Sequence, residues 1–267
     1  MLLLFDIGNT NTHLGIAEGG QIIRQKDVPT VSWRGSRGPE ILARFVGRSH
    51  LKGVALCSVV PHTTPLVRKA VRDLWSLGCL ELNSLTVRGL GIDYPSPKTI
   101  GPDRLAGAVA AKQRFGAPCV VVDFGTAVTF DVVNRAGNYA GGIIAPGLAA
   151  MTDYLHEKTA LLPRIRIKEI RTAIGKSTEE AMLVGAVHGY RGLVRELILE
   201  LRKELKSPTL PVIATGGYAD LIAARLPEIS AVDPLLTLEG LRLVWEAAKS
   251  KVSRLKGPSR NPKLNRS

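Results

Sequence analysis

The chain opens with the stretch MLLLFDIGNTNTHLGI, residues 1–16, in which an apolar strand runs directly into a polar turn. Four apolar residues in a row, Leu2 to Phe5, are typical of a strand that is covered on both faces. The segment DIGNTNT at 6–12 then brings together a carboxylate, a glycine, and short hydroxyl and amide side chains. Such a turn lets backbone N–H groups approach phosphate oxygens, and a carboxylate beside it can hold hydrated Mg²⁺. We therefore predict a phosphate and metal cradle here.

A second stretch of the same kind lies 117 residues later. The segment VVVDFGTAVTFDVV at 120–133 again runs from apolar residues into Asp, one apolar residue and Gly. A threonine stands six residues after the aspartate in both copies, Asp6 to Thr12 and Asp123 to Thr129. One strand–turn–strand unit used twice predicts two related α/β lobes whose turns grip the phosphates of a nucleotide from opposite sides.

The remaining elements fit α/β lobes. Periodicity and start signals predict helices at 38–49, 64–77, 101–115 and 178–206, a buried strand at 54–60, and a strand, glycine turn and helix in 211–226. Ser177 and Glu180 form a capping box at the start of the longest of these helices. The predicted lobes are residues 1–117 and 118–250, followed by a basic tail at 251–267.

Composition excludes several classes of protein. The hydrophobic fraction of 45% and the charged fraction of 22% are ordinary for a globular chain. No apolar run approaches the roughly 18 residues of a membrane span, and no basic segment precedes Leu2 as a signal peptide requires. Three scattered cysteines predict neither a disulfide framework nor a zinc site. We expect a cytoplasmic protein without a membrane partner.

The net charge of +13 raises the question of nucleic-acid binding. The last 17 residues carry six basic residues and no acid, which leaves +7 for the rest of the chain. We interpret this tail as a largely disordered, solvated extension. The remaining excess suits an enzyme with polyanionic substrates, and nucleic acid is not the expected partner.

Taken together, six motifs make a specific resemblance. In chain order they are DIGNTNT, GPDR (101–104), DFGTAVT (123–129), GGIIAPG (141–147), IGKST (174–178) and TGGYADL (215–221). Over about residues 1–248 the chain resembles the type III pantothenate kinases of the actin/hexokinase/Hsp70-like superfamily. The resemblance implies two actin-like, ribonuclease H-like lobes with a cleft between them. It also implies a homodimer and ATP-dependent phosphorylation of the 4′-hydroxyl of pantothenate, the first step toward coenzyme A.

The resemblance also implies a role for individual residues. Asp103 matches the catalytic proton acceptor, and Asp123 the ligand of a monovalent cation, K⁺ or NH₄⁺. Asp6 would meet Mg²⁺ through the phosphates. The residues that match ATP contacts are Asp6, Ile7, Gly8, Asn9, Thr10, Asn11, Thr12, His13 and Thr126. Those that match pantothenate contacts are Tyr94, Gly101, Pro102, Asp103, Arg104 and Thr178.

Physical reasoning supports some of these roles and leaves alternatives open. Asp103 follows Pro102 where a helix begins, and the helix N-terminus favours an ionised carboxylate, so we expect an unraised pKa. Asp103 could instead only cap that helix, and Arg104 could be an ordinary surface arginine. Thr178 lies where free N–H groups suit an anion, but a mere capping residue would look the same. His13 could be incidental.

Three alternative functions need to be set beside the pantothenate kinase. The GKST at 175–178 matches the end of a phosphate loop, but Ile170 stands where that loop requires its first glycine, so we reject it. Another small-molecule kinase with the same cradle is a second alternative, and Tyr94, GPDR and Thr178 argue against it. A transcription accessory or regulatory protein is the third, because some relatives of this family are described in that way. The presence of Asp6, Asp103 and Asp123 together favours the enzyme.

Overall fold

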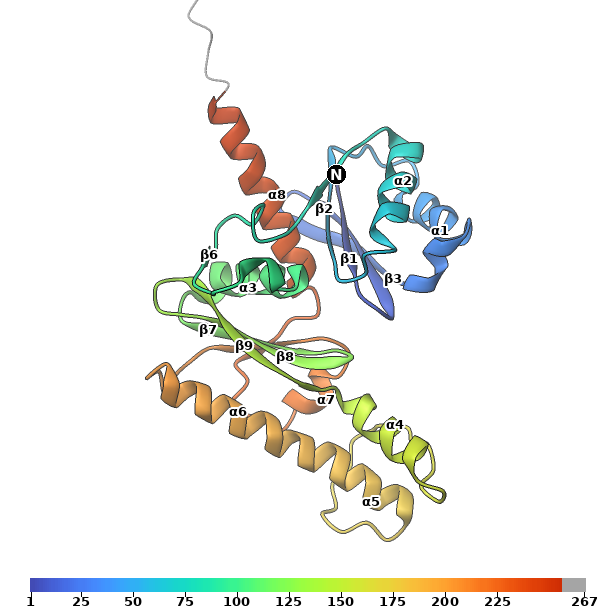
Figure 1. The fold of residues 1–267 in the computed structure, drawn as a ribbon, viewed down its shortest axis with the longest axis vertical. Coiled ribbons are helices and arrows are strands. Elements are labelled where there is room, and N and C mark those ends of the chain that lie inside the picture. The colour runs from blue at the N-terminus through green and yellow to red at the C-terminus, as the bar shows by residue number, and fades with distance from the viewer. Residues whose placement is uncertain (256–267) are drawn as a thin grey trace, which may run out of the picture.

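The computed structural model describes the backbone of residues 1–255 and the side chains of residues 1–250, and it contains two β-sheets (Figure 1). The first sheet has the strand order β3-β2-β1-β4-β5. Strands β1, β2 and β3 pair antiparallel, and β4 and β5 continue the sheet parallel to β1. Its strands are β1 (Leu2–Ile7), β2 (Asn11–Glu18), β3 (Gln21–Pro29), β4 (Gly53–Ser58) and β5 (Cys79–Glu81).

The second sheet repeats this arrangement. Its order, β11-β10-β7-β8-β9-β6, corresponds strand for strand to the first sheet, with β6 added beyond β9. The predicted duplication is therefore confirmed, and β7 lies 117 residues after β1. Its strands are β6 (Gly91–Ile92), β7 (Cys119–Phe124), β8 (Ala127–Val133), β9 (Asn138–Pro146), β10 (Val212–Thr215) and β11 (Ala231–Val232).

The register of the two hairpins corrects one detail of the predicted repeat. Asp6 pairs with His13, whereas Asp123 pairs with Thr129. The first turn is one residue longer than the second, so His13 and not Thr12 corresponds to Thr129. The equal spacing of the two threonines was therefore misleading, because a shift of one residue moves a side chain to the other face of a sheet.

Helices form layers around the two sheets (Figure 1). Helices α1 (Arg37–Val46) and α2 (Thr64–Trp75) cover the outer face of the first sheet. Helices α3 (Pro102–Phe115) and α8 (Leu236–Leu255) pack against each other between the sheets. The second sheet is covered on its far side by α6 (Tyr190–Glu204) and α7 (Ala219–Ala223).

Shorter elements complete the chain. Helices α4 (Leu148–Lys158) and α5 (Thr178–Val184) extend beyond the end of the second sheet (Figure 1). The remaining turns are the 3₁₀ helices η1 (Thr30–Arg34) and η2 (Pro97–Thr99), and the π-helical η3 (Gly185–Gly189), which joins α5 to α6.

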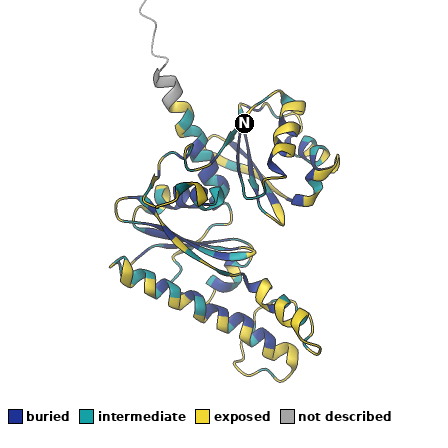
Figure 2. Ribbon diagram, in the orientation of Figure 1, coloured by how far each residue is buried: buried dark blue, intermediate teal, exposed yellow. Residues whose placement is uncertain are grey.

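The alternation of side chains along the strands explains the layers, and Figure 2 shows the buried strands at their centre. Leu2 and Leu4 of β1 face α3 and α8, whereas Leu3, Phe5 and Ile7 face α1 and α2. Strand β7 behaves in the same way, with its odd-numbered residues facing the layer between the sheets. This period of two explains the four apolar residues in a row, because both faces of the strand are covered.

The predicted helices are confirmed with small shifts at their ends, and α4 and α8 were not predicted. The expected helix over 178–206 is one continuous run of α5, η3 and α6. At its start the Ser177 Oγ accepts the Glu180 N–H at 3.2 Å, as a capping box requires. The Glu180 carboxylate accepts the N–H of Lys176, at 2.7 Å, instead of that of Ser177.

Several segments cross the predicted boundary between the lobes. Strand β6 precedes residue 118 but pairs with β9 of the second sheet, and α8 follows it but packs on the first sheet. Helix α8 continues through Leu255, so the predicted tail begins five residues too early, and residues 256–267 lie outside the described residues. The three cysteines are free.

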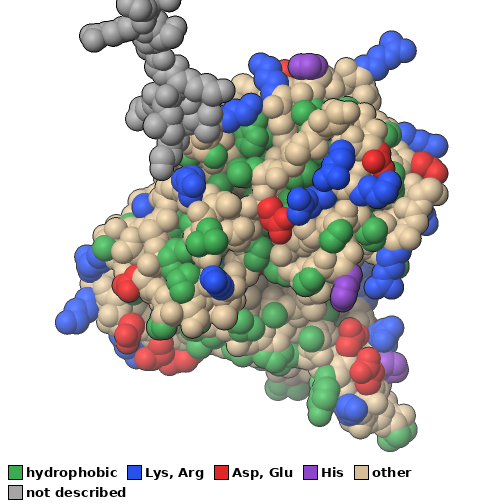
Figure 3. All heavy atoms as spheres, turned by 45° about the horizontal axis from the view of Figure 1, so that its top comes forward, with side chains coloured by type: hydrophobic (Ala, Val, Ile, Leu, Met, Phe, Trp, Pro, Cys, Tyr) green, Lys and Arg blue, Asp and Glu red, His purple; other side chains and the backbone are tan. Residues whose placement is uncertain are grey.

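One face of the molecule carries its basic residues in a dispersed manner. Figure 3 shows Lys and Arg side chains scattered over the visible face, with acidic and apolar groups between them. A nucleic-acid surface would gather such charges on one face. Among the described helices, none has both the length and the apolar character that crossing a membrane requires.

Candidate active site

Three carboxylates from three elements meet between the sheets. Asp6 follows Leu2 and Leu4 on the inner face of β1, and Asp123 occupies the same position on β7. Asp103 lies in the first turn of α3, which packs between them. Their charges interact, because the charge of Asp103 raises the pKa of both Asp6 and Asp123. The two lobes and the central helix therefore present one acidic cluster.

Burial is the main cause of the raised pKa values in this cluster. Desolvation, helped by the neighbouring carboxylates, raises the pKa of Asp123 to about 7 and that of Asp6 to about 6. The pKa of Asp103 is also raised, because burial outweighs the N–H of Arg104 that donates to its Oδ1 at 2.8 Å. The expectation of an unraised Asp103 is therefore wrong. The helix N-terminus favours the ionised carboxylate, but the loss of water around the buried group disfavours it more strongly.

The start of α3 is shaped around the Asp103 carboxylate. The residue that caps the helix is Gly101, so Asp103 is not a capping residue. A Cβ on Gly101 would lie 2.5 Å from the Asp103 Oδ1, so only glycine leaves room for the carboxylate in this position. Pro102 begins the helix, where its missing N–H leaves no hydrogen bond unmade.

Asp6 is held by one neighbour. The Cys57 thiol on β4 donates to the Asp6 Oδ1 at 3.3 Å. Burial keeps the pKa of Cys57 well above that of an ordinary thiol, so the group remains protonated and acts only as a donor. Within the part of the chain that the structure describes, no three His, Cys, Asp or Glu side chains are close enough to bind a metal ion together. A divalent cation here would need ligands from a bound molecule.

A glycine makes room for the Asp123 carboxylate. Gly216, in the TGG after β10, has φ +89°, a conformation that side-chain-bearing residues rarely adopt. A Cβ there would lie 2.4 Å from the Asp123 Oδ1 and 2.7 Å from the Phe124 backbone. Among the described residues no hydrogen bond engages the Asp123 side chain. The Asp123 carboxylate is therefore left with oxygen atoms of the kind that a hard cation prefers.

Gly216→Ala should disrupt this arrangement. The added methyl group clashes with Asp123 and strains the backbone, so we expect the phosphotransferase activity that the resemblance implies to fall by roughly tenfold or more. The matched control is Gly217→Ala, where a Cβ meets nothing within 4 Å. Steady-state phosphorylation rates, with melting temperatures to check folding, measure the effect. Equal activity of the two variants would contradict the role of Gly216.

The first turn presents only part of its sequence to a ligand. Asn9, Thr10 and Asn11 are exposed at its tip. Ile7 and Thr12 face the outer layer and are fully buried, and the Thr12 hydroxyl accepts the Trp33 Nε1–H at 3.0 Å. Their side chains cannot reach a ligand, so for these two residues the predicted ATP contact could involve only backbone groups.

Hydrogen bonds from Thr30, the residue after β3, hold the first turn in place. The Thr30 hydroxyl donates to the Gly8 carbonyl at 2.7 Å, and the Thr30 N–H donates to the Thr10 carbonyl at 2.9 Å. His13 faces the inner layer, where its Nδ1 lies 2.7 Å from the Asp27 Oδ1. The imidazole of His13 is close enough to Asp6 to lower the pKa of that carboxyl group, so His13 lies beside the acidic cluster.

The second turn is shorter and rests on α4. Thr126 is exposed at the tip, as an ATP contact requires. Its carbonyl accepts the Gly147 N–H at 3.2 Å, and a Cβ on Gly147 would lie 2.2 Å from that oxygen. The last glycine of GGIIAPG therefore lets the chain that enters α4 approach the turn closely.

Arg104, which follows Asp103 in the chain, and Tyr94 belong to a group of contacting side chains that also includes Asp131 and Tyr139. The Arg104 Nε donates to the Asp131 Oδ1 at 2.6 Å, and Tyr139 donates its hydroxyl to the same oxygen at 2.9 Å. Tyr94 packs edge-on against Tyr139, with ring centroids 6.2 Å apart. Arg104 is thus not an ordinary surface arginine, since its side chain is only 17% exposed.

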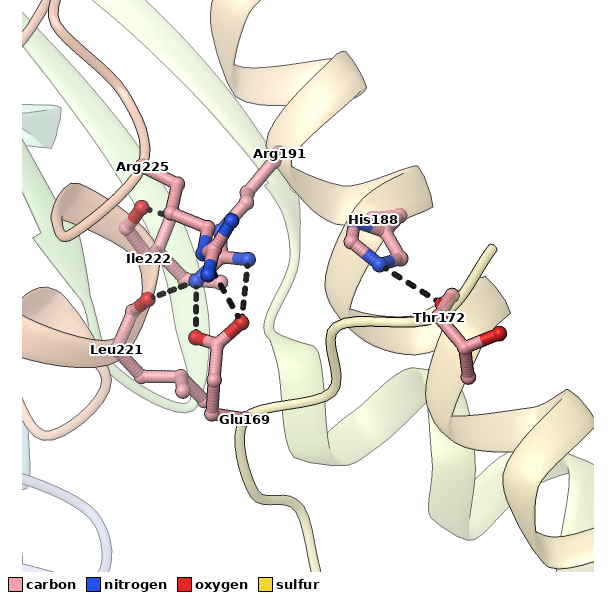
Figure 4. A network of polar contacts seen from close by, with 7 residues as sticks. All are labelled: Glu169, Thr172, His188, Arg191, Leu221, Ile222 and Arg225. Carbon is pink, nitrogen blue, oxygen red and sulfur yellow. Dashed lines mark hydrogen bonds and ion pairs between the residues drawn. The ribbon is translucent and has the colours of Figure 1, made fainter. Parts of the chain in front are cut away.

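Thr178 is not brought to this cluster within one chain. It begins α5, which lies beside α4 and far from β1 (Figure 1). The loop over 159–177 that leads to it is tied to the long helix by Arg191, whose guanidinium binds the Glu169 carboxylate and backbone carbonyls of α7 (Figure 4). Gly175 of this loop packs closely against Ala181 of α5. The loop follows helix α4 and contains no strand of the kind that leads into a phosphate loop, which agrees with the rejection of GKST as such a loop.

Sequence reasoning missed Cys57, Asp131 and Tyr139. One signal could have found Asp131, which stands between Phe130 and Val132 in an apolar strand. A charge in such a place is almost never buried without a partner. Cys57 and Tyr139 carried no comparable signal.

Comparison with known proteins agrees with this geometry. The family model described as type III pantothenate kinase matches residues 2–200. The chain belongs to the type III pantothenate kinase family. A family member from Akkermansia muciniphila is 46% identical over 90% of this chain and 96% of its own. Those from Methylacidiphilum infernorum and Geobacter sulfurreducens are 43% and 39% identical, each over 92% of this chain and over 88% and 98% of their own.

Solved structures support the fold of this family member. A protein assigned to the Baf family of transcriptional activators, from Campylobacter jejuni, matches with a TM-score of 0.58 over 93% of this chain and 99% of its own, at 18% identity. MreB 5 of Spiroplasma citri, bound to AMPPNP, matches with a TM-score of 0.51 over 95% and 98%, at 10% identity. Both likenesses concern the fold alone, and they confirm the predicted actin-like lobes.

Proposed function

We propose that this chain transfers the γ-phosphoryl group of ATP to the primary 4′-hydroxyl of pantothenate, in the cytoplasm. The product is 4′-phosphopantothenate, and the reaction is the first step toward coenzyme A. The observation that carries the proposal is the meeting of Asp6, Asp103 and Asp123 between two duplicated lobes, in a member of the type III pantothenate kinase family.

Asp103 has the chemistry of the proton acceptor. A bond forms between the acceptor oxygen and the γ-phosphorus, the bond to the β,γ-bridging oxygen breaks, and ADP leaves. The hydroxyl proton passes to the Asp103 carboxylate. Because the transition state is loose, the carboxylate mainly orients the hydroxyl. Its raised pKa makes it a better acceptor near neutral pH than an ordinary aspartate.

The two turns and Asp6 suit the nucleotide. The exposed tips, Asn9 to Asn11 and Thr126, can contact phosphates from the two lobes. Mg²⁺ favours one or two carboxylates together with phosphate oxygens and water. The Asp6 carboxylate at the end of β1 fits that requirement as the carboxylate beside the first turn. When bound, the ion would neutralise phosphate charge.

Exchanging K⁺ for Na⁺ should lower the phosphorylation rate. The support is the Asp123 carboxylate with Gly216 beside it, which offers oxygen ligands in a place where a bound cation would offset buried negative charge. The measurement is the rate at constant ionic strength in KCl, NH₄Cl and NaCl, and Asp123→Asn should remove the difference. Equal rates of the wild-type protein in all three salts would contradict a monovalent-cation site.

We also propose a homodimer. Helix α4 and the loop after it expose apolar side chains that a monomer rarely leaves together, namely Met151, Tyr154, Leu155 and Leu161. Thr178 begins α5 beside this surface, so a second copy packed here can carry its own Thr178 toward the active site. Light scattering should give twice the chain mass, and Tyr154→Lys should shift it toward the monomer and raise the KM for pantothenate.

The direct test is ADP release with and without pantothenate, with the product identified by mass spectrometry. Pantothenate-dependent turnover that yields 4′-phosphopantothenate supports the proposal. The chain shortened to end at Leu255, where α8 ends, serves as a matched sample, and equal turnover would show that residues 256–267 are dispensable. Absence of turnover at every K⁺ concentration would favour the regulatory alternative.

A further inference from the structure

We propose that Asp131, together with Tyr139, is a positioning residue that fixes Arg104 for binding the acceptor substrate. The inference rests on the proposed function and adds to it a buried set of groups that hold the acceptor-binding arginine. Asp131 lies on the inner face of β8 and is 2% exposed.

The hydrogen bonds of Asp131 are all made inside the protein. Its Oδ1 accepts the Arg104 Nε–H at 2.6 Å and the Tyr139 hydroxyl at 2.9 Å, and its Oδ2 accepts the Thr129 hydroxyl at 3.3 Å. Burial raises its pKa to about 6 even though Arg104 and Tyr139 oppose the shift. With its oxygens occupied in this way, Asp131 acts on a substrate only through its neighbours.

The guanidinium of Arg104 is held on one side and free on the other. The Nε is bound to Asp131 and the Nη2 donates to the Phe130 carbonyl at 3.3 Å. Among the described residues, no acceptor is bound to the Nη1. Two fixed bonds define the plane of the guanidinium, so the remaining N–H groups are aimed before a ligand arrives, which reduces the entropy lost on binding.

Gly142 on β9 makes the space for this arrangement. A Cβ at this position would lie 2.7 Å from the Arg104 Nη2 and 1.7 Å from the Phe130 carbonyl. The adjacent Gly141 has φ +124°, and a Cβ there would contact the Tyr94 ring at 3.5 Å. Gly142 therefore keeps room for the Arg104 guanidinium, whereas Gly141 is required by its backbone conformation and leaves Tyr94 at ordinary contact distance.

The location of the network favours the acceptor over ATP. Asp131 pairs with Val121 and Thr129 with Asp123, so Asp131 lies two residues, about 7 Å, along the sheet from the level of Asp123, on the side away from the phosphate turn. Arg104 follows Asp103, which orients the acceptor hydroxyl in the proposed reaction. Tyr94 and Arg104 flank the same Tyr139 ring, the guanidinium at 5.9 Å from its centroid.

Steady-state kinetics of Asp131→Asn test the inference. The KM for pantothenate should rise about tenfold to a hundredfold, because a misplaced binding group has effects of that size, while the KM for ATP stays within about twofold. Tyr139→Phe keeps the ring and should raise the same KM by a smaller factor. The matched control is Asp233→Asn, since Asp233 also pairs with an arginine, Arg114 at 2.8 Å, away from the site.

A double variant separates positioning from a structural role. If Asp131 acts through Arg104, then Asp131→Asn combined with Arg104→Gln should raise the pantothenate KM no more than Arg104→Gln alone. Additive effects, an equal rise in both KM values, or an unchanged pantothenate KM would each overturn the inference. If Asp131→Asn fails to fold, Tyr139→Phe combined with Arg104→Gln gives the same comparison. Absence of pantothenate phosphorylation by the wild-type chain would instead contradict the proposed function.

Discussion

Replacing Asp103 with asparagine should lower the kcat for pantothenate phosphorylation by about 10²–10⁴-fold, the usual contribution of a positioned proton acceptor. The amide is nearly the same size, so Gly101 still leaves space for it. It cannot accept the hydroxyl proton, and it orients the acceptor poorly. We expect the KM for ATP to change little, because the turns that we propose as the phosphate contacts lie on β1–β2 and β7–β8.

Folding should not suffer in this variant. The Asp103 carboxylate is buried beside Asp6 and its pKa is raised, so the charged form costs stability above that pKa. Asp103→Asn should therefore have an unchanged or higher melting temperature at pH 8. The matched control is Asp93→Asn, an exposed aspartate on the segment before α3. A kcat near that of the wild type would remove Asp103 from its assigned role.

The ligand-free protein should lose the stability contributed by the Asp6 and Asp123 carboxyl groups as the pH rises from about 4 to about 7. A carboxylic acid with a raised pKa binds its proton more tightly in the folded chain than in the unfolded chain. The folded state therefore gains protons, relative to the unfolded state, between the ordinary value of 3.8 and the raised values of about 6 for Asp6 and about 7 for Asp123. Stability falls as pH rises through that window.

Asp123→Asn isolates the largest of these contributions. Removing the carboxylate should raise the melting temperature at pH 8 by about 5–10 °C, from about 2–3 kcal/mol of relieved desolvation and repulsion. The difference in melting temperature between Asp123→Asn and the wild type should become smaller as the pH falls toward 5, because the wild-type Asp123 carboxyl group is then protonated. Melting curves in buffers free of Mg²⁺ and K⁺ measure it.

The control for the pH dependence is Asp73→Asn, an exposed aspartate on α2 that pairs with Lys69. It should leave the slope of melting temperature against pH unchanged. Superimposable curves of melting temperature against pH for the wild type and Asp123→Asn would show that burial of the ionised Asp123 carboxylate does not destabilise the fold. The prediction would then be wrong.

The fold was largely predictable because its signals are local and repeated. Four apolar residues before Asp6 and the matching run before Asp123 identified two buried strands, and glycines with short polar residues identified the turns. Helix α8 was missed because its apolar residues face two sheets and α3, which weakens the one-sided periodicity that identifies a surface helix.

The candidate site was predicted less completely, for two physical reasons. The length of a turn decides which face of the next strand a residue occupies, so Thr12 and Thr129 lie on different faces although their spacing from the aspartate is equal. The pKa of Asp103 depends on how much water the surrounding lobes remove, and that quantity is not local.

The sequence by itself determined the duplicated strand–turn–strand units, the family and the identity of the three carboxylates, because each depends on residue types at fixed short spacings. Only the tertiary structure decided that these carboxylates share one buried place, that Asp131 and Tyr139 hold Arg104, and that Thr178 lies away from them in a single chain. Those relations join segments far apart in the sequence, and packing between the two sheets sets their distances and their desolvation.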